Sequence, residues 1–201
     1  MIIDPDFEIV KQCQSKDPAV CETAFYTIYK KYGDRALNIS YRILGNYDDA
    51  LDVTQDVFIK VFKKIGDFRK DARFFTWFYR IVVNLSIDKR RKQGAHQVIS
   101  ESDRNGGLSE VPDDKAVTID KLASDAHLEK RVQDCLLKLS ENLRTVTVLR
   151  YIEGLSYQEV AETLECSIGT VKSRLNRAHK TLEELLRSEL DLAREAKKDN
   201  A

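Results

Sequence analysis

Apolar residues recur at helical spacing along most of this chain, and the clearest example is residues 155–186. Ser156 with Glu159 three positions later has the pattern of a capping box, which predicts that a helix begins there. The apolar face of that helix consists of Val160, Ala161 and Leu164. A turn is expected at residues 165–166, and Ser167 is placed to cap a second helix.

The second of these helices is expected to have one apolar and one basic face. Its apolar residues recur at alternating steps of three and four, which predicts a continuous buried stripe: Ile168, Val171, Leu175, Ala178, Leu182 and Leu185. The opposite face carries donors and cations: Gly169, Ser173, Asn176, Arg177 and Lys180, with Thr170 and Lys172 at its edges. Such a face either binds DNA in a helix-turn-helix or is only a solvated surface. Arg174 lies nearer the buried edge, where either a phosphate or an internal partner is expected.

The remaining segments also favour helices, because neither a sustained alternation of apolar and polar residues nor a hairpin signal is found. Helix breaks in the first half are expected near residues 16–18, 45–47 and 66–72. In the second half, Ser140 is placed to cap a helix that continues to about Ile152.

A change in composition divides the chain into two domains. Residues 93–125 are rich in glycine, serine and acidic residues, and no aromatic residue occurs between Arg80 and Arg150. We therefore expect an all-α fold with two small helical domains, residues 1–92 and 126–192, joined by a flexible acidic linker. A polar tail follows at residues 193–201.

Charge is distributed unevenly along the 201 residues, although the formal net charge is zero. Residues 60–92 hold 11 basic and 3 acidic residues, a local charge of +8, whereas residues 100–130 hold 4 basic and 8 acidic residues, a local charge of −4. Two basic surfaces separated by an acidic connector are compatible with nucleic-acid binding.

Several classes of protein are disfavoured by the sequence. No apolar run approaches the roughly 18–20 residues that span a bilayer, so we expect a cytoplasmic protein without membrane insertion. The four cysteines are Cys13, Cys21, Cys135 and Cys166, whose spacing fits neither a zinc site nor a disulfide framework. Reduced, mostly buried thiols are expected, with a redox pair at Cys13 and Cys21 as the alternative. No catalytic constellation, metal site or cofactor motif is recognisable, so we expect no enzymatic activity and no cofactor.

Residues 68–92 combine aromatic and basic side chains. Six aromatic residues fall within twelve positions: Phe68, Phe74, Phe75, Trp77, Phe78 and Tyr79. A helical wheel places Phe74 and Phe78 on an apolar face, opposite Arg80 and Asn84. Unpaired bases stack on aromatic rings with roughly 1–3 kcal/mol each, so the other rings suit a short melted DNA segment. For Trp77 and Tyr79 the alternative is packing between helices.

These segments together resemble a bacterial RNA polymerase sigma factor of the compact extracytoplasmic-function group. The resemblance covers nearly all of residues 20–187 and rests on DVTQDVFIKVFKKIGDF, FFTWFYRIVVNLSIDKRRK and LSYQEVAETLECSIGTVKSRLNRAHKTL, in this order. Three positions depart from the common pattern. Ser140 stands where a proline is frequent, Lys172 where some members have arginine, and Asn176 where some have an aromatic residue. The promoter sequence therefore cannot be transferred from relatives.

The resemblance implies three sets of functional residues. Recognition and melting of the minus-ten element are implied for Phe68, Phe75, Trp77, Tyr79, Arg80, Asn84, Lys89, Arg90 and Arg91. Recognition of the minus-thirty-five element is implied for Thr170, Lys172, Ser173, Asn176, Arg177 and Lys180. Binding to core polymerase is implied for Asp52, Gln55, Asp56, Phe58 and Ile59.

The expected function is promoter-specific initiation of transcription. The implied partners are core RNA polymerase, through its clamp helices and flap, promoter DNA, and an anti-sigma factor that holds the protein inactive. The alternative is a stand-alone helix-turn-helix regulator that binds duplex DNA without polymerase. That alternative leaves the aromatic residues beside the basic cluster at residues 68–92 without a purpose.

Overall fold

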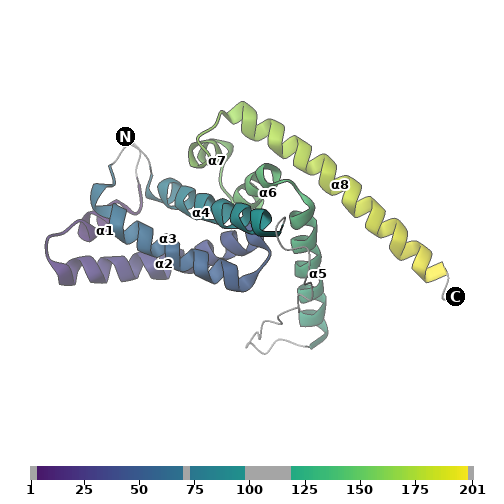
Figure 1. The fold of residues 1–201 in the computed structure, drawn as a ribbon, viewed down its shortest axis with the longest axis horizontal. Helices are drawn as coiled ribbons and strands as arrows, with labels where there is room; N and C mark the ends of the chain where they lie inside the picture. The colour runs from purple at the N-terminus through teal and green to yellow at the C-terminus, as the bar shows by residue number, and fades with distance from the viewer. Residues whose placement is uncertain (1–3, 70–72, 98–118, 199–201) are drawn as a thin grey trace.

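The computed structural model describes residues 4–69, 73–97 and 119–198, and every regular element within these ranges is helical (Figure 1). The elements are α1 (Phe7–Cys13), α2 (Pro18–Leu44), α3 (Tyr47–Lys64), the 3-10 turn η1 (Ile65–Asp67), α4 (Phe74–Gln97), α5 (Ile119–Lys138), α6 (Glu141–Thr147), the π-helical turn η2 (Val148–Ile152), α7 (Tyr157–Thr163) and α8 (Ile168–Lys198). The expected all-α fold class is confirmed. The helix breaks predicted near residues 16–18 and 45–47 lie between α1, α2 and α3.

Helices α2, α3 and α4 pack against one another and form the N-terminal domain, with α1 against α2 (Figure 1). The Asp17 carboxylate accepts a hydrogen bond from the Ala19 N–H at 3.0 Å, and Pro18 occupies the first helical position of α2. The helix ends at Gly45, whose φ of 81° lies in the left-handed region. A Cβ at Gly45 would also lie 2.7 Å from the Leu137 side chain, so this turn requires glycine for two reasons.

The core of the N-terminal domain is aliphatic along α3 and aromatic where α4 crosses α2. Val53, Val57 and Val61 recur at helical spacing on α3 and are buried. Phe74 and Phe78 of α4 are fully buried and contact the ring of Tyr32 on α2. These contacts fix the orientation of α4, and therefore the direction of its basic face.

The N-terminal segment is tied into the same domain by two aspartates. The Asp4 carboxylate accepts a hydrogen bond from the Phe74 N–H at 2.7 Å, which satisfies a donor in the first turn of α4. The buried Asp6 accepts hydrogen bonds from Lys31 and from the Tyr32 hydroxyl. Burial and the hydrogen bond to Asp6 raise the pKa of Tyr32, so this phenol stays protonated as a donor.

Helices α6, α7 and α8 form the core of the C-terminal domain, and α8 packs against both α6 and α7. Arg144 of α6 is fully buried and donates hydrogen bonds to the backbone carbonyls of Leu136, Leu137, Leu139 and Ile43. The first three carbonyls lie at the end of α5 and the fourth lies near the end of α2. One buried arginine therefore supplies hydrogen-bond donors to the free backbone carbonyls at the carboxyl ends of two helices, one from each domain.

Several boundaries differ from those expected. Helix α4 continues past Lys92 to Gln97, α5 already begins at Ile119, and α8 extends past Leu192 to Lys198. The interior of the expected linker, residues 98–118, lies outside the described residues. Ser140 takes the N-cap position of α6, but its side chain forms no capping hydrogen bond. The helix expected to reach Ile152 changes to a π-helical turn after Thr147, where the Glu153 N–H donates to the carbonyl of Val148.

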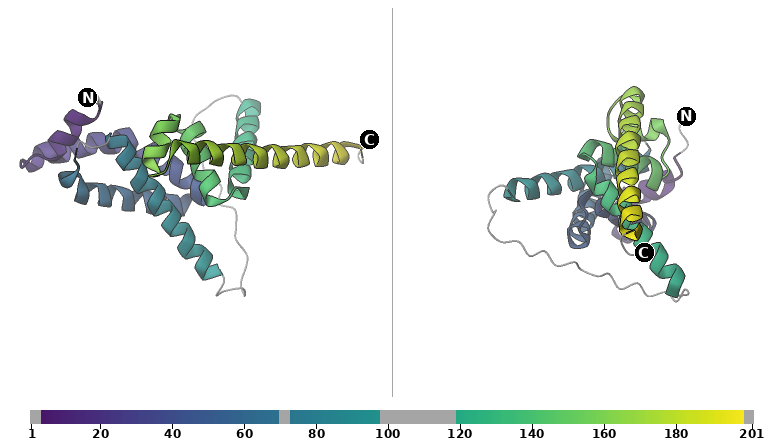
Figure 2. Two further views of the ribbon diagram at one scale, coloured as in Figure 1. Left: turned by 90° about the horizontal axis from the view of Figure 1, so that it is seen from above. Right: turned by 90° about the vertical axis from the view of Figure 1, so that its right-hand side faces the viewer.

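The two domains contact each other along two lines. Helix α7 lies against α4, and the end of α2 lies against α5 and α6 (Figures 1 and 2). The last turns of α8 project away from both domains (Figure 2). Among the helices of the described ranges, none has the length and apolar character needed to cross a membrane.

Candidate nucleic-acid interface

The turn between α7 and α8 is stabilised by the two caps that the sequence indicated. The Ser156 hydroxyl accepts a hydrogen bond from the Glu159 N–H at 3.2 Å, and the Glu159 carboxylate accepts one from the Ser156 N–H at 2.9 Å, which completes the capping box. Glu165 adopts a φ of 50°, which reverses the chain after α7. The Ser167 hydroxyl then accepts a hydrogen bond from the Thr170 N–H at 3.0 Å at the start of α8.

The polar face of α8 is exposed, as expected for a recognition helix. Val171, Leu175 and Ala178 are buried and hold the opposite face against the domain. Five polar residues are exposed, and within the described ranges none of them has a hydrogen-bond or ion-pair partner: Lys172, Ser173, Asn176, Arg177 and Lys180. Thr170 is only partly exposed, because its hydroxyl lies 2.9 Å from that of Ser167. The free donors can therefore contact base edges and phosphates without first breaking an internal contact.

The aromatic residues at the start of α4 form a partly exposed cluster. The Trp77 ring lies 5.1 Å from the Phe68 ring and 5.7 Å from the Phe74 ring, measured between centroids. The Phe75 ring packs instead against the Tyr79 ring, at 6.1 Å between centroids, and the Arg73 guanidinium lies 5.9 Å from the Phe75 centroid. Phe68, Phe75 and Trp77 are partly buried, so each leaves ring surface exposed. Residues 70–72 of the loop that was expected to receive a base lie outside the described residues.

Tyr79 differs from the other three aromatic candidates, because it is 1% exposed. Its ring packs against those of Tyr32, Phe75 and Phe78. Its hydroxyl accepts a hydrogen bond from Arg35 at 3.1 Å and donates one to Glu153 at 3.1 Å. Burial raises the pKa of Tyr79 to about 12, against the lowering effect of Arg35. In this arrangement Tyr79 follows the packing alternative and offers no surface for a base.

All four cations of α4 that were predicted to hold phosphates have internal partners. Arg80 donates to the Glu165 carboxylate at 2.6 Å and to the Glu162 carbonyl at 2.8 Å. The Arg91 guanidinium lies 2.8 Å from the Glu141 carboxylate, and Arg90 donates to the Ile43 carbonyl at 2.8 Å.

The fourth of these cations, Lys89, lies between Asp49 and Asp52 of α3, at 3.0 Å and 3.3 Å. The hydrogen bond to Asp49 raises the pKa of Lys89 above its ordinary value. Asn84 is exposed and has no hydrogen-bond partner within the described ranges. Of the polar residues assigned to the minus-ten element, only Asn84 is therefore free of an internal contact.

The predicted polymerase-binding residues of α3 do not all face solvent. Gln55, Asp56 and Ile59 are exposed, and Ile59 retains 53% of its accessible surface. Asp52 is exposed but contacts Lys89. Phe58 is 7% exposed and packs against the rings of Tyr29, Phe25 and Phe78, so it belongs to the core.

Some residues that shape these surfaces were not found by sequence reasoning. Phe62 on α3 is 56% exposed and extends the apolar surface of Ile59, which the width of the apolar stripe over residues 51–62 could have indicated. Arg144 carried no such signal, because an arginine in a helical segment ordinarily indicates an exposed position. The acidic partners of α4, which include Glu159 and Glu165, lie 86 and 85 positions away from Arg73 and Arg80 in sequence.

No metal centre accompanies these surfaces. Over the described ranges, no group of three or more histidine, cysteine, aspartate or glutamate side chains could hold a metal ion. All four cysteines are free thiols. The Cys21 thiol donates to the Cys13 carbonyl at 3.0 Å, and burial raises the pKa of the Cys13 thiol to about 11, which disfavours a reactive thiolate there.

A two-domain helical protein with an exposed recognition helix and an aromatic-basic helix belongs to the class of DNA-binding proteins. Family models narrow this class. Sigma-70 region 2 matches residues 28–96, and Sigma-70 region 4 matches residues 129–182. The chain belongs to the sigma-70 family of RNA polymerase sigma factors, in its extracytoplasmic-function (ECF) group.

Curated relatives match over most of their length. The ECF RNA polymerase sigma factor SigW of Bacillus subtilis is 36% identical over 182 residues, which cover 89% of this chain and 95% of SigW. The RNA polymerase sigma-H factor of Pseudomonas aeruginosa is 30% identical, with 91% and 94% covered.

Solved structures have the same fold. CnrH, solved in complex with the cytosolic domain of CnrY, superposes with a TM-score of 0.67 at 29% identity, and 92% of this chain and 99% of CnrH are covered. The sigma factor RpoE of Bartonella quintana, solved with the anti-sigma factor NepR, gives a TM-score of 0.65 at 24% identity, with 81% and 96% covered. The expected fold of two helical domains is confirmed by these structures.

Proposed function

We propose that this protein binds core RNA polymerase and directs it to promoters, where it recognises a minus-ten and a minus-thirty-five element and opens the DNA. The observation that carries this proposal is the presence, in one chain of this family, of a free cationic recognition face on α8 and a partly exposed aromatic cluster on α4. A protein that reads only duplex DNA needs only the recognition face, whereas melted DNA is held by stacking on the aromatic cluster.

The upstream element is assigned to the exposed face of α8. Arg177 and Lys172 are suited to guanine or to phosphate, and Asn176 is suited to adenine. Ser173 and Lys180 extend the same face, and Thr170 lies at its edge. Because none of the five exposed residues has an internal partner, binding here costs only desolvation and the ordering of side chains.

The downstream element is assigned to α4 and the loop before it. Phe68, Phe75 and Trp77 supply partly exposed rings, and Asn84 supplies an amide that can pair with a base edge. Arg80, Arg90, Arg91 and Lys89 are assigned to phosphates, and each must exchange an internal partner for DNA.

Polymerase binding is assigned to the exposed surface of α3. Gln55 and Asp56 supply an amide and a carboxylate, and Ile59 with Phe62 supplies an apolar patch beside them. An apolar centre with a polar rim is the usual composition of a protein interface. The C-terminal domain is assigned to the polymerase flap on family resemblance. We also propose that an anti-sigma factor inhibits this chain, and that the chain acts in the cytoplasm as an initiation factor without enzymatic activity of its own.

Run-off transcription tests the proposed function. Purified bacterial core polymerase is combined with a fragmented genomic library from the source organism, with and without this protein. New discrete start sites that share two spaced upstream elements are expected only in its presence. Specific footprints on duplex DNA without polymerase, together with no new start sites, would instead establish the stand-alone regulator.

A further inference from the structure

We propose that the C-terminal domain shields the promoter-melting face of the N-terminal domain in the free protein, because glutamates on and around α7 occupy the cations of α4 as DNA phosphates would. This inference rests on the proposed function, since it assigns two of those cations, Arg80 and Arg91, to promoter DNA. The surface concerned runs along α4, and its partner is the acidic edge formed by Glu141, Glu153, Glu159 and Glu165.

Three ion pairs join the two domains along α4. Arg73 contacts Glu159 at 2.8 Å, Arg80 contacts Glu165 at 2.6 Å, and Arg91 contacts Glu141 at 2.8 Å. In each pair the cation belongs to the N-terminal domain and the carboxylate belongs to the C-terminal domain. A row of carboxylates facing a row of arginines reproduces the charge pattern of a nucleic-acid backbone.

Glu153 adds a fourth contact, which is directed at an aromatic residue. Its carboxylate accepts a hydrogen bond from the Tyr79 hydroxyl at 3.1 Å, and Tyr79 in turn accepts one from Arg35. The contact with Glu153 therefore covers the polar edge of Tyr79. The paired arginines, Tyr79 and Asn84, the residue assigned to read a base, all lie on the side of α4 that faces the C-terminal domain.

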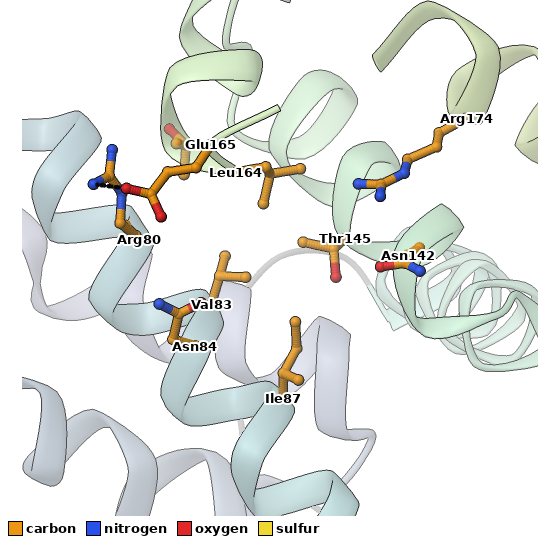
Figure 3. Close-up of a pocket in the computed structure, with 10 residues that line it drawn as sticks. Arg80, Val83, Asn84, Ile87, Asn142, Thr145, Leu164, Glu165 and Arg174 are labelled. Carbon is orange, nitrogen blue, oxygen red and sulfur yellow. Dashed lines mark hydrogen bonds and ion pairs between the residues drawn. The ribbon is translucent and has the colours of Figure 1, made fainter. Parts of the chain in front are cut away.

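Asn84, the residue assigned to read a base, lines a partly open cavity between the domains. A cavity of about 180 Å³ is lined by Arg80 and Asn84 of α4, Asn142 and Thr145 of α6, Glu165 of the turn and Arg174 of α8 (Figure 3). This volume is below the roughly 300–1,000 Å³ of ordinary small-molecule sites. The residues of the C-terminal domain therefore narrow the approach of a DNA strand to this side of Asn84, whose side chain is otherwise exposed.

The contact between α4 and the acidic edge is incomplete, which suits a reversible state there, whereas the buried Arg144 joins the ends of α2 and α5 separately. Arg80 uses its terminal nitrogens on Glu165 and on the Glu162 carbonyl, while its buried Nε has no partner. Arg174 points into the cavity and forms no ion pair with any residue of the described ranges (Figure 3). Because several pairs are also partly exposed, each one is weak, and binding to polymerase and DNA can replace them.

The test uses glutamine in place of the two glutamates that pair with Arg73 and Arg80. Glu159→Gln with Glu165→Gln removes both charges, and glutamine preserves the capping box at the start of α7. The matched control is Glu8→Gln with Glu22→Gln, which removes the same charge. Glu8 on α1 and Glu22 on α2 are both exposed, and neither forms an ion pair within the described ranges.

Two measurements are made on the full chain without polymerase. The first is the anisotropy of a fluorescent single-stranded oligonucleotide of mixed sequence, and the second is the radius of gyration from small-angle X-ray scattering. We expect Glu159→Gln with Glu165→Gln to bind the oligonucleotide roughly three- to tenfold more tightly than the wild type and to have a larger radius of gyration. The control should change affinity by less than about twofold, since it breaks no ion pair between the domains.

Equal affinities and equal radii for the variant and its control would overturn the inference. Its failure is distinguishable from that of the proposed function, which run-off transcription measures separately. If the protein directs transcription but the double variant shows neither tighter oligonucleotide binding nor a larger radius of gyration, the proposed function stands and the shielding inference fails. If the double variant shows both changes but the protein directs no transcription, the shielding contact stands and the proposed function fails.

Discussion

The two basic regions of this protein differ in what their cations contact. On α8, Lys172, Arg177 and Lys180 are exposed and have no ion-pair partner among the described residues, whereas on α4 the residues Arg80, Lys89, Arg90 and Arg91 all have internal partners. Sequence composition shows both regions as basic. The local charge of a segment therefore does not indicate whether its cations are available to a partner, because availability depends on acidic residues that are distant in sequence.

Arg144, whose guanidinium forms hydrogen bonds to four backbone carbonyls, should contribute most to stability among these cations. Arg144→Ala removes hydrogen bonds to four backbone carbonyls in a fully buried position, so we expect the free energy of unfolding to fall by about 3 kcal/mol or more. Urea titration followed by far-ultraviolet circular dichroism measures the change. Arg174→Ala, which removes a partly exposed arginine without an ion pair, should change stability by less than about 0.5 kcal/mol. Similar losses for both variants would contradict this account.

Arg177, an exposed cation on α8, should contribute to DNA binding and not to the stability of the fold. Arg177→Ala is expected to weaken holoenzyme binding at the upstream element by about tenfold or more, in line with roughly 1–3 kcal/mol for a specific contact. Footprinting measures the loss, and native gels should show unchanged association with core polymerase. Arg187→Ala is the control on the same helix, because Arg187 pairs with Glu183 at 2.6 Å. Loss of polymerase binding by Arg177→Ala would refute its assigned role.

The aromatic cluster on α4 should act at the opening step. Trp77→Ala removes a partly exposed ring, so we expect reduced permanganate reactivity of melted thymines with little change in closed-complex affinity, an effect of roughly 1–3 kcal/mol. Phe78→Leu alters a fully buried ring of the same helix and should lower stability without a selective opening defect. Equal defects of Trp77→Ala in both steps would indicate that this ring only packs.

The smallest expected effect is a pH dependence of the contact between the domains. Burial raises the pKa of Glu153 above 4.5, while its neighbours Tyr79 and Arg35 oppose the shift. A carboxyl whose pKa is raised by closure favours closure when protonated, and this contribution is lost as pH rises through the raised pKa. The radius of gyration should therefore increase slightly as the pH rises from the ordinary glutamate pKa towards neutrality.

Glu153→Gln keeps an uncharged hydrogen-bonding side chain at this position and should abolish that pH dependence. Arg35 and Tyr79 face the same position and retain their charge states over this range, since the pKa values of both are raised. An unchanged pH dependence in Glu153→Gln would assign it to another group.

Local signals in the sequence were sufficient for the helix-turn-helix. The capping box at Ser156, the turn at residues 165–166 and the stripe from Val171 to Ala178 all depend on residues within a few positions of one another. Periodicity also predicted Phe74 and Phe78 as core residues. Local rules succeed there because the side chains that determine each element lie on that element or on the next one.

Contacts between distant segments were not predictable in the same way. Nothing near Tyr79 in sequence indicates that Arg35 and Glu153 enclose its hydroxyl. The burial of Phe58 depends on rings of α2 and α4, although its neighbour Ile59 is exposed on the same helix. Helical periodicity predicts which side chains share a face, but the packing of other helices determines which parts of that face are covered.

Site-specific photocrosslinking of the holoenzyme to promoter DNA can show which DNA element each of the two proposed surfaces contacts. The photoreactive residue p-benzoylphenylalanine is placed at Lys180 on α8 or at Phe75 on α4, both of which retain exposed surface. The account predicts that Lys180 crosslinks to the upstream element in closed and open complexes, and that Phe75 crosslinks to the melted strand downstream only after opening. Crosslinks from both positions to the same element, or none from Phe75 in the open complex, would contradict the division of promoter recognition between these two surfaces.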